Sequence, residues 1–381
     1  MLLAPLRRGL AVSAVAAAAL LASCTTGPSA AELEAARVAQ AQAEAAALAA
    51  RRPPPISLNQ DVAQAASIYV SFIRDVETIR GGFPDAEAIQ VAMRRGAAYD
   101  PAQLSQGMVA YASILALQSP EFVAGVRQFA VDPAQRQRMI NDIVYNPAYA
   151  ATLPGADAAA GLIISAMGRE IDTLTAIADA VEGDAYTIQE RNDPRRRWAV
   201  MPIPNREVRL ETAKRISEGR MLPSAEDSAR LFAAAHTGSG LNVSAGSARP
   251  PYTPVVANAL SIAALAALGA AGDEARPNTQ ALMTESSSEF CLSMSKLNLF
   301  QCLAASRPSY EDMFCVGRHI VRDLATCARG SMRPIGTAFA SDPTDTTGRA
   351  TGTPTPSVTT GTMTPSITTS TLNQTPVTPP N

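Results

Sequence analysis

Four cysteines in the C-terminal third of this 381-residue chain have the spacing that most clearly predicts chemistry. Cys291 and Cys302 are 11 positions apart, and Cys315 and Cys327 are 12 positions apart. Both flanking segments have helical sequences separated by a turn at Pro308, which predicts an antiparallel helical hairpin over residues 288–330. In an oxidising compartment, an even set of cysteines is expected to form disulfides.

Helix geometry selects one of the three possible pairings. Eleven residues of α-helix rise about 16 Å, so Cys291 and Cys302 cannot bridge each other, but they lie only about 20° apart around the helix and can face one partner helix. A crossed pairing would require parallel helices. The nested pairing, Cys302–Cys315 and Cys291–Cys327, remains. Twelve residues place Cys327 about 120° from the face of Cys315, and we expect a kink at Gly317 or fraying near Cys327 to absorb this offset.

The two cysteine pairs resemble those of the twin Cys-x9-Cys helical hairpins, with spacers of ten and eleven residues in place of nine. The resemblance implies the hairpin architecture only. Zinc binding is the alternative, because Cys315 and His319 are one helical turn apart. Zinc thiolates are less expected where thiols are oxidised, so we predict disulfides, no metal and no cofactor.

Side chains suited to catalysis are few. The chain has two histidines, His236 and His319, and no H-E-x-x-H, G-x-S-x-G or P-loop motif. The sequence 238–240 (Gly-Ser-Gly) predicts a flexible connector. Glu170 and Asp172 flank the apolar stripe of a long helix and are expected to face solvent. We therefore predict no enzyme, with a glycan hydrolase as the alternative because its paired carboxylates need no local motif.

Residues 191–220 contain nine basic and four acidic residues. Such a segment is a candidate patch for an anionic glycan, a lipid headgroup or an acidic partner, or else a solvated connector whose Trp198 packs on a neighbouring helix. The whole chain carries a net charge of −2, which gives no reason to expect nucleic acid as a partner. The candidate patch residues are Arg195, Arg196, Arg197, Arg206 and Arg209.

The elements that position these residues are predicted to be helices throughout. In residues 58–190, four residues that can cap a helix are each followed directly by proline, which suits the first helical position. The capping residues are Asp100, Ser119, Asp132 and Asn146. These signals predict a bundle of short helices, with apolar side chains at spacings of three and four. A basic connector follows at 191–223, and a second helical region with the hairpin at 224–335. Its apolar run 255–271 predicts a helix buried in the bundle, with a transmembrane helix as the alternative.

The two ends of the chain have different compositions from this body. Residues 24–57 contain an Ala-rich segment that is either a helical stalk or a solvated tether, and then a proline linker. Residues 336–381 are predicted to be disordered, because positions 341–381 contain fifteen threonines and seven prolines and no aromatic residue.

The first residues predict export. Arg7 and Arg8 precede an apolar run, 10–22, that is too short to span a bilayer. The sequence 21–24 (Leu-Ala-Ser-Cys) resembles the lipobox of bacterial lipoproteins. This resemblance implies that the signal peptide 1–23 is removed and that Cys24 carries the lipid. Thr25 stands where many inner-membrane lipoproteins have aspartate, which implies the outer membrane, with the protein facing the periplasm.

Together these features predict a non-enzymatic envelope lipoprotein. We expect a helical scaffold or accessory subunit that is held to the membrane by its lipid and docks on another envelope protein or on the cell wall. The alternative is a carrier that binds an apolar or anionic ligand between its helices.

Replacing Cys24 with alanine should abolish lipid attachment. Metabolic labelling with a fatty-acid analogue should then mark the wild-type protein and leave the variant unlabelled or uncleaved. Equal labelling of the two proteins would contradict the assignment of Cys24 as the lipidated residue.

Overall fold

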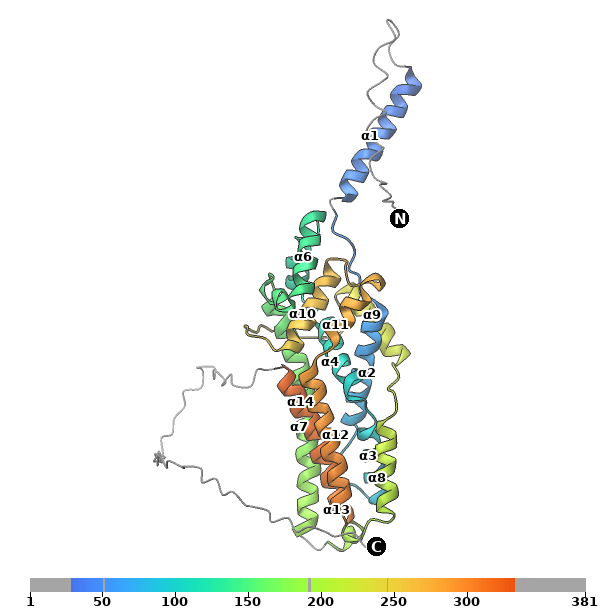
Figure 1. The fold of residues 1–381 in the computed structure, drawn as a ribbon, viewed down its shortest axis with the longest axis vertical. Coiled ribbons are helices and arrows are strands. Elements are labelled where there is room, and N and C mark those ends of the chain that lie inside the picture. The colour runs from blue at the N-terminus through green and yellow to red at the C-terminus, as the bar shows by residue number, and fades with distance from the viewer. Residues whose placement is uncertain (1–28, 51, 191–192, 245, 333–381) are drawn as a thin grey trace, which may run out of the picture. The chain divides into compact units, whose positions relative to one another are not determined.

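The computed structural model describes residues 29–50, 52–190, 193–244 and 246–332. Within these ranges the chain is helical and has no β-strand, which confirms the predicted all-α class (Figure 1). The predicted signal segment 1–23, the predicted lipidation residue Cys24 and the tail 336–381 lie outside the described residues.

The helices follow one another with short connections. The α-helices are α1 Ala30–Ala50, α2 Gln60–Glu77, α3 Ala86–Ala97, α4 Pro101–Ala116, α5 Pro120–Arg127, α6 Pro133–Tyr145, α7 Ala156–Glu190, α8 Arg206–Ser217, α9 Ala225–Thr237, α10 Pro254–Ala267, α11 Arg276–Met283, α12 Ser286–Ala305, α13 Ser309–Val316 and α14 Asp323–Met332. Short 3-10 helices are η1 Pro147–Thr152, η2 Pro194–Val200 and η3 Asp273–Ala275, and η4 Gly317–Arg322 is a π-helical turn.

Proline and a capping side chain begin several helices, as predicted. Asp100, Ser119 and Asp132 each accept a hydrogen bond from the backbone N–H three residues later, at the starts of α4, α5 and α6. Thr253 does the same for α10. Asn146 is the exception, because its side chain makes no such bond and the 3-10 helix η1 follows it.

The Ala-rich segment is a helix, which confirms the first of its two alternatives. Ser29 and Glu32 form a reciprocal cap at its start: the N–H of Glu32 donates to Ser29 Oγ at 3.3 Å, and the N–H of Ser29 donates to Glu32 Oε2 at 2.8 Å. This arrangement satisfies backbone donors that the first helical turn leaves free.

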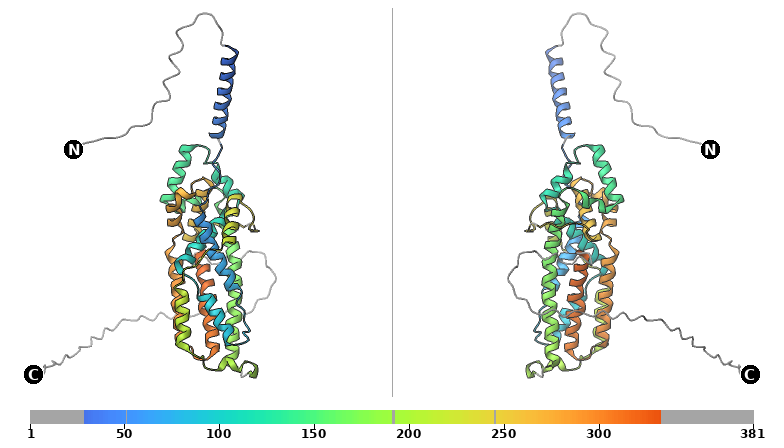
Figure 2. Two further views of the ribbon diagram at one scale, coloured as in Figure 1. Left: turned by 90° about the vertical axis from the view of Figure 1, so that its right-hand side faces the viewer. Right: turned by 90° about the vertical axis from the view of Figure 1, so that its left-hand side faces the viewer.

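The helices of residues 52–332 share one hydrophobic core. α2 and α10 pack against α4, α9 packs against α2, and α7 packs against α13, η4 and α14. In both side views, the axes of α7 and of the hairpin helices lie roughly side by side along the domain (Figure 2). Core residues come from both predicted helical regions, 58–190 and 224–335, which therefore form a single domain.

The predicted connector 191–223 also belongs to this fold. The N–H of Ile203 donates to the Arg307 carbonyl at 2.8 Å, and the N–H of Ser309 donates to the Met201 carbonyl at 3.2 Å. These bonds join the connector to the turn of the cysteine hairpin.

No single helix among the described residues is long and apolar enough to cross a membrane. α4 and α5 are long and apolar enough only when they are taken together, and the chain bends by 83° between them. Almost all of α10 is buried in the core, which confirms the buried alternative for the apolar run 255–271.

The contact between α2 and α4 depends on a glycine. A Cβ atom at Gly107 would lie 2.6 Å from the Ala65 carbonyl oxygen and 2.9 Å from Tyr69 Cβ. A backbone carbonyl cannot move aside as a flexible side chain can. Gly168, in α7, is the matched contrast, because nothing lies within 4 Å of the same position.

Gly107→Ala should therefore lower the free energy of unfolding by about 1–3 kcal/mol or more through overpacking. Gly168→Ala should raise it by about 0.5–1 kcal/mol, since alanine loses less backbone entropy in a helix. Urea denaturation of both variants checks this, and equal effects would contradict the close approach of α2 and α4.

Candidate functional site

Two nested disulfides hold α12 against α13 and α14. Cys302 is bonded to Cys315 and Cys291 to Cys327, each pair with its Cα atoms 5.7 Å apart. Both separations lie inside the usual range for disulfides. The predicted antiparallel hairpin and its nested pairing are confirmed.

The predicted 120° offset of Cys327 is absorbed at Gly317, where the π-helical turn η4 begins. A π turn bonds residue i to i+5 and so takes one residue more than an α turn. Twelve residues that include such a turn cover about the same rotation as eleven residues of α-helix, which returns Cys327 to the face of Cys315. Cys327 itself is buried within α14, so the end of this helix is not frayed there.

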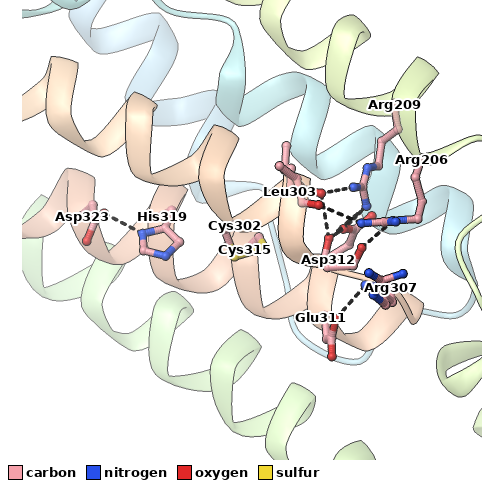
Figure 3. Close-up of a disulfide and its surroundings, with 12 residues drawn as sticks. Arg206, Arg209, Cys302, Leu303, Arg307, Glu311, Asp312, Cys315, His319 and Asp323 are labelled. Atoms are coloured by element: carbon pink, nitrogen blue, oxygen red, sulfur yellow. Dashed lines mark hydrogen bonds and ion pairs between the residues drawn. A yellow bond between two sulfur atoms is a disulfide. The ribbon is translucent and has the colours of Figure 1, made fainter. Parts of the chain in front are cut away.

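Both residues of the zinc alternative make other contacts in the structure. The sulfur of Cys315 is bonded to Cys302, and His319 Nδ1 lies 3.0 Å from Asp323 Oδ2 (Figure 3). No group of three or more metal-binding side chains occurs within the described ranges. The other histidine, His236, is on α9 with its Nδ1 2.8 Å from the Phe232 carbonyl oxygen.

The exposed residues of helix α12 do not include its charged ones. Its charged residues are Glu289, which is half-buried, and Lys296. The Lys296 ammonium donates to the carbonyls of Tyr99 and Ser217 and lies over the Tyr99 ring. Burial of this ammonium lowers the pKa of Lys296 to about 8.

We define the outer face of α12 by its exposed residues, which are all uncharged. Three of them are large and apolar: Phe290 is 67% exposed, Met294 38% and Leu297 46%. Their spacing of four and then three residues places them on one side of the helix. The full set is Ser286, Ser287, Phe290, Ser293, Met294, Leu297, Gln301, Ala304 and Ala305.

A buried ion pair fixes α8 to the turn of the hairpin. The Arg209 guanidinium donates to the Asp312 carboxylate, and the Arg209 side chain is 5% exposed while that of Asp312 is fully buried. Asp312 also accepts from Gln90 Nε2 at 3.0 Å and from Ser306 Oγ at 2.6 Å. A buried carboxylate needs several donors to replace its hydration, and this site supplies three. Figure 3 shows Arg209 beside Asp312.

The five arginines therefore do not form the predicted anionic-partner patch. Arg209 is in the interior, and Arg206 donates to the carbonyls of Ser306 and Ala304, both at 2.7 Å, at the end of α12. A cation at this position suits the negative end of the helix dipole.

The remaining three arginines of that prediction lie in or near η2. Arg196 is partly buried and pairs with Asp184 on α7. Arg195 and Arg197 are exposed, and Trp198 packs against the core as the connector alternative predicted. The positive charge of the segment is thus divided between structural contacts and solvent.

The sequence Ser309-x-x-Asp312 has the pattern of a capping box for the second hairpin helix, but the structure does not form that cap. Pro308 occupies the cap position and makes no side-chain bond, while the N–H of Arg307 donates to Glu311 Oε2 at 2.7 Å. The Asp312 carboxylate instead lies against the buried Arg209 guanidinium, whose charge it balances.

Glu170 was expected to face solvent but is largely enclosed. The hydroxyl of Tyr69, a 1% exposed residue of α2, donates to Glu170 Oε2 at 3.2 Å, and the ring of Tyr111 stacks on Tyr69 with 5.7 Å between centroids. Burial raises the pKa of Glu170 to about 7, and the Glu77 carboxylate adds to this rise. The two tyrosines come from α2 and α4, so the apolar pattern of α7 alone could not predict that Glu170 is enclosed. The neighbouring Asp172 is exposed as expected.

Arg209→Met should lower the free energy of unfolding by about 3–5 kcal/mol, because it leaves the Asp312 carboxylate buried without its cation. Arg195→Met, at a side chain that is 91% exposed, should change it by less than about 0.5 kcal/mol. Chemical denaturation of the two variants measures the contrast. A surface patch of five equivalent arginines would instead show similar, small effects.

The stability of the Glu170→Gln variant, compared with that of the wild type, should increase as the pH rises. The folded state raises the pKa of Glu170, so its contribution to stability is complete below about pH 4.5 and is lost as the pH passes 7. The variant should gain melting temperature over the wild type at pH 8 and less or none at pH 5. Asp172→Asn is the control, and a flat difference for Glu170→Gln between the two pH values would contradict the enclosed carboxyl.

Comparison of the chain with protein-family models, with curated proteins and with solved structures found no match.

Proposed function

We propose that this protein is a non-enzymatic, lipid-anchored scaffold or accessory subunit of the bacterial cell envelope. Its helical domain docks on another envelope protein through the outer face of α12, while lipid on Cys24 holds it at the outer membrane on the periplasmic side. The observation that carries the proposal is the uncharged, apolar character of that outer face.

The composition of the face suits a protein partner. The core of a protein–protein interface is depleted of charge and enriched in aromatic residues and methionine. The outer face of α12 has Phe290, Met294 and Leu297 in one row and no charged side chain over the length of the helix. Contiguous apolar surface of this kind favours binding of another apolar surface over release into water.

The disulfides favour an envelope location. Structural disulfides persist in oxidising compartments such as the periplasm and are rare where thiols are kept reduced. Two of them stabilise the helix that would carry the docking face. The lipobox-like sequence that ends at Cys24 supports the same location independently.

The two envelope partners considered from sequence differ in the chemistry they require. Cell-wall glycan would bind mainly through hydrogen bonds, which the row of Phe290, Met294 and Leu297 cannot make, although three serines and Gln301 flank that row. An envelope protein with an apolar groove or helix matches the face better, and we favour it.

Photo-crosslinking in the native host tests this proposal. A photoreactive phenylalanine analogue placed at Ser293, within the outer face, should give discrete cross-linked products of the full-length protein. The same analogue at Gln137, an exposed residue of α6, is the positional control.

The companion variants place a charge on the two surfaces. Leu297→Glu should abolish the products formed from Ser293, because it buries an unpaired carboxylate in the interface. Val144→Glu, at a 37% exposed valine of α6, should leave them unchanged. Identical products from positions 293 and 137, or products that survive Leu297→Glu, would contradict docking through this face.

A further inference from the structure

A small hollow lies between α7 and the first turns of α13, apart from the outer face of α12. Its volume is about 210 Å³. Each helix contributes three residues, and three of the six are aromatic. The lining residues are Ala185, Tyr186 and Gln189 of α7, and Tyr310, Glu311 and Phe314 of α13.

The walls of the hollow are held by contacts on either side. A Cβ atom at Gly317 would lie 3.0 Å from both Val181 Cγ1 and Glu182 Cγ, so α7 and the π turn touch about one turn away from the hollow. The Cys302–Cys315 disulfide fixes the other side of α13 to α12. The hollow is therefore bounded by packed helices and not by a loop.

The aromatic rings line the hollow from both helices. Tyr186 and Phe314 meet edge to face, with centroids 5.7 Å apart and planes at 65°. Tyr310 precedes Phe314 by one helical turn, which places both rings on the same side of α13. Tyr186 is 50% exposed, so a ligand can reach the rings from solvent.

The one lining side chain that is charged at neutral pH is an acid, Glu311. Glu311 receives the N–H of Arg307 on Oε2 at 2.7 Å, which holds the carboxylate at the start of α13 (Figure 3). A carboxylate beside three aromatic rings attracts cations and repels anions. Aromatic faces attract ammonium groups through their quadrupole, by about 0.5–2 kcal/mol per contact.

We propose that this hollow binds an organic cation with a head of the size of a trimethylammonium group, the rings surrounding the methyl groups and Glu311 balancing the charge. The volume is below the range of about 300–1,000 Å³ that drug-sized ligands occupy, so only a small head group fits. The chemistry is shared by free quaternary amines and by phosphocholine lipid headgroups. The site does not depend on the docking function proposed for α12.

Calorimetric titration of the wild-type protein with choline and with its neutral isostere 3,3-dimethylbutan-1-ol tests the role of charge. Choline should bind roughly tenfold or more tightly than the alcohol, since shape and apolar contact are the same in both. Equal binding of the two compounds, or no binding of choline at tens of millimolar, would overturn the proposal. This comparison requires no variant.

Variants then locate the site. Tyr186→Leu and Glu311→Gln should each weaken choline binding by roughly tenfold, while Tyr145→Leu, at a 92% exposed tyrosine of α6, should leave it unchanged. Glutamine keeps an acceptor for the Arg307 N–H, so the start of α13 is preserved. Choline binding that persists in both site variants would place it elsewhere and overturn the assignment.

A vesicle measurement distinguishes the two sources of the cation. The measurement uses the Cys24→Ala variant, which cannot carry the proposed lipid, and its sedimentation with phosphatidylcholine vesicles, if competed by free choline, would identify a lipid headgroup as the ligand. Choline binding without vesicle binding would identify a free quaternary amine. Vesicle binding that choline does not compete would overturn the hollow as the lipid site.

Discussion

Two covalent links at different heights along α12 are the constraint on which the C-terminal half of the domain depends. One disulfide alone would let α12 and its partner pivot, whereas links at Cys291 and Cys302 fix both the register and the direction of the pair. The partner helix can meet both links only because the π turn η4 takes up one extra residue. That same turn presents Gly317 to α7, so the cysteine pairing and the packing on the longest helix are satisfied together.

The surfaces of this domain follow from where its charges are used. Arg209 belongs to a segment that could be a solvated connector by its sequence, and Lys296 to the hairpin helix α12, yet both reach inward to a carboxylate or to backbone carbonyls. Their cost of burial is offset by several hydrogen bonds each. The exposed residues of α12 are all uncharged, while Glu311 supplies negative charge to the aromatic hollow beside α7.

Sequence predicted the features that depend on neighbours along the chain. Proline caps, apolar faces and the nested cysteine pairing all follow from spacings within one or two helices. The environments of Arg209 and Glu170 could not be predicted in this way, because their partners come from helices about a hundred positions away. Asp312 shows the conflict directly: its local pattern predicts a helix cap, and a distant guanidinium takes the carboxylate instead. The offset at Gly317 was visible in the spacing, but its form as a π turn was not.

Peptide mapping of the unreduced protein tests the central constraint most directly. The account predicts one linked peptide pair that contains Cys302 and Cys315, and a second that contains Cys291 and Cys327. These pairs would place η4 and the outer face of α12 as described. Linkage of Cys291 to Cys315 or of Cys302 to Cys327, or four free thiols, would contradict the hairpin and the surfaces that it positions.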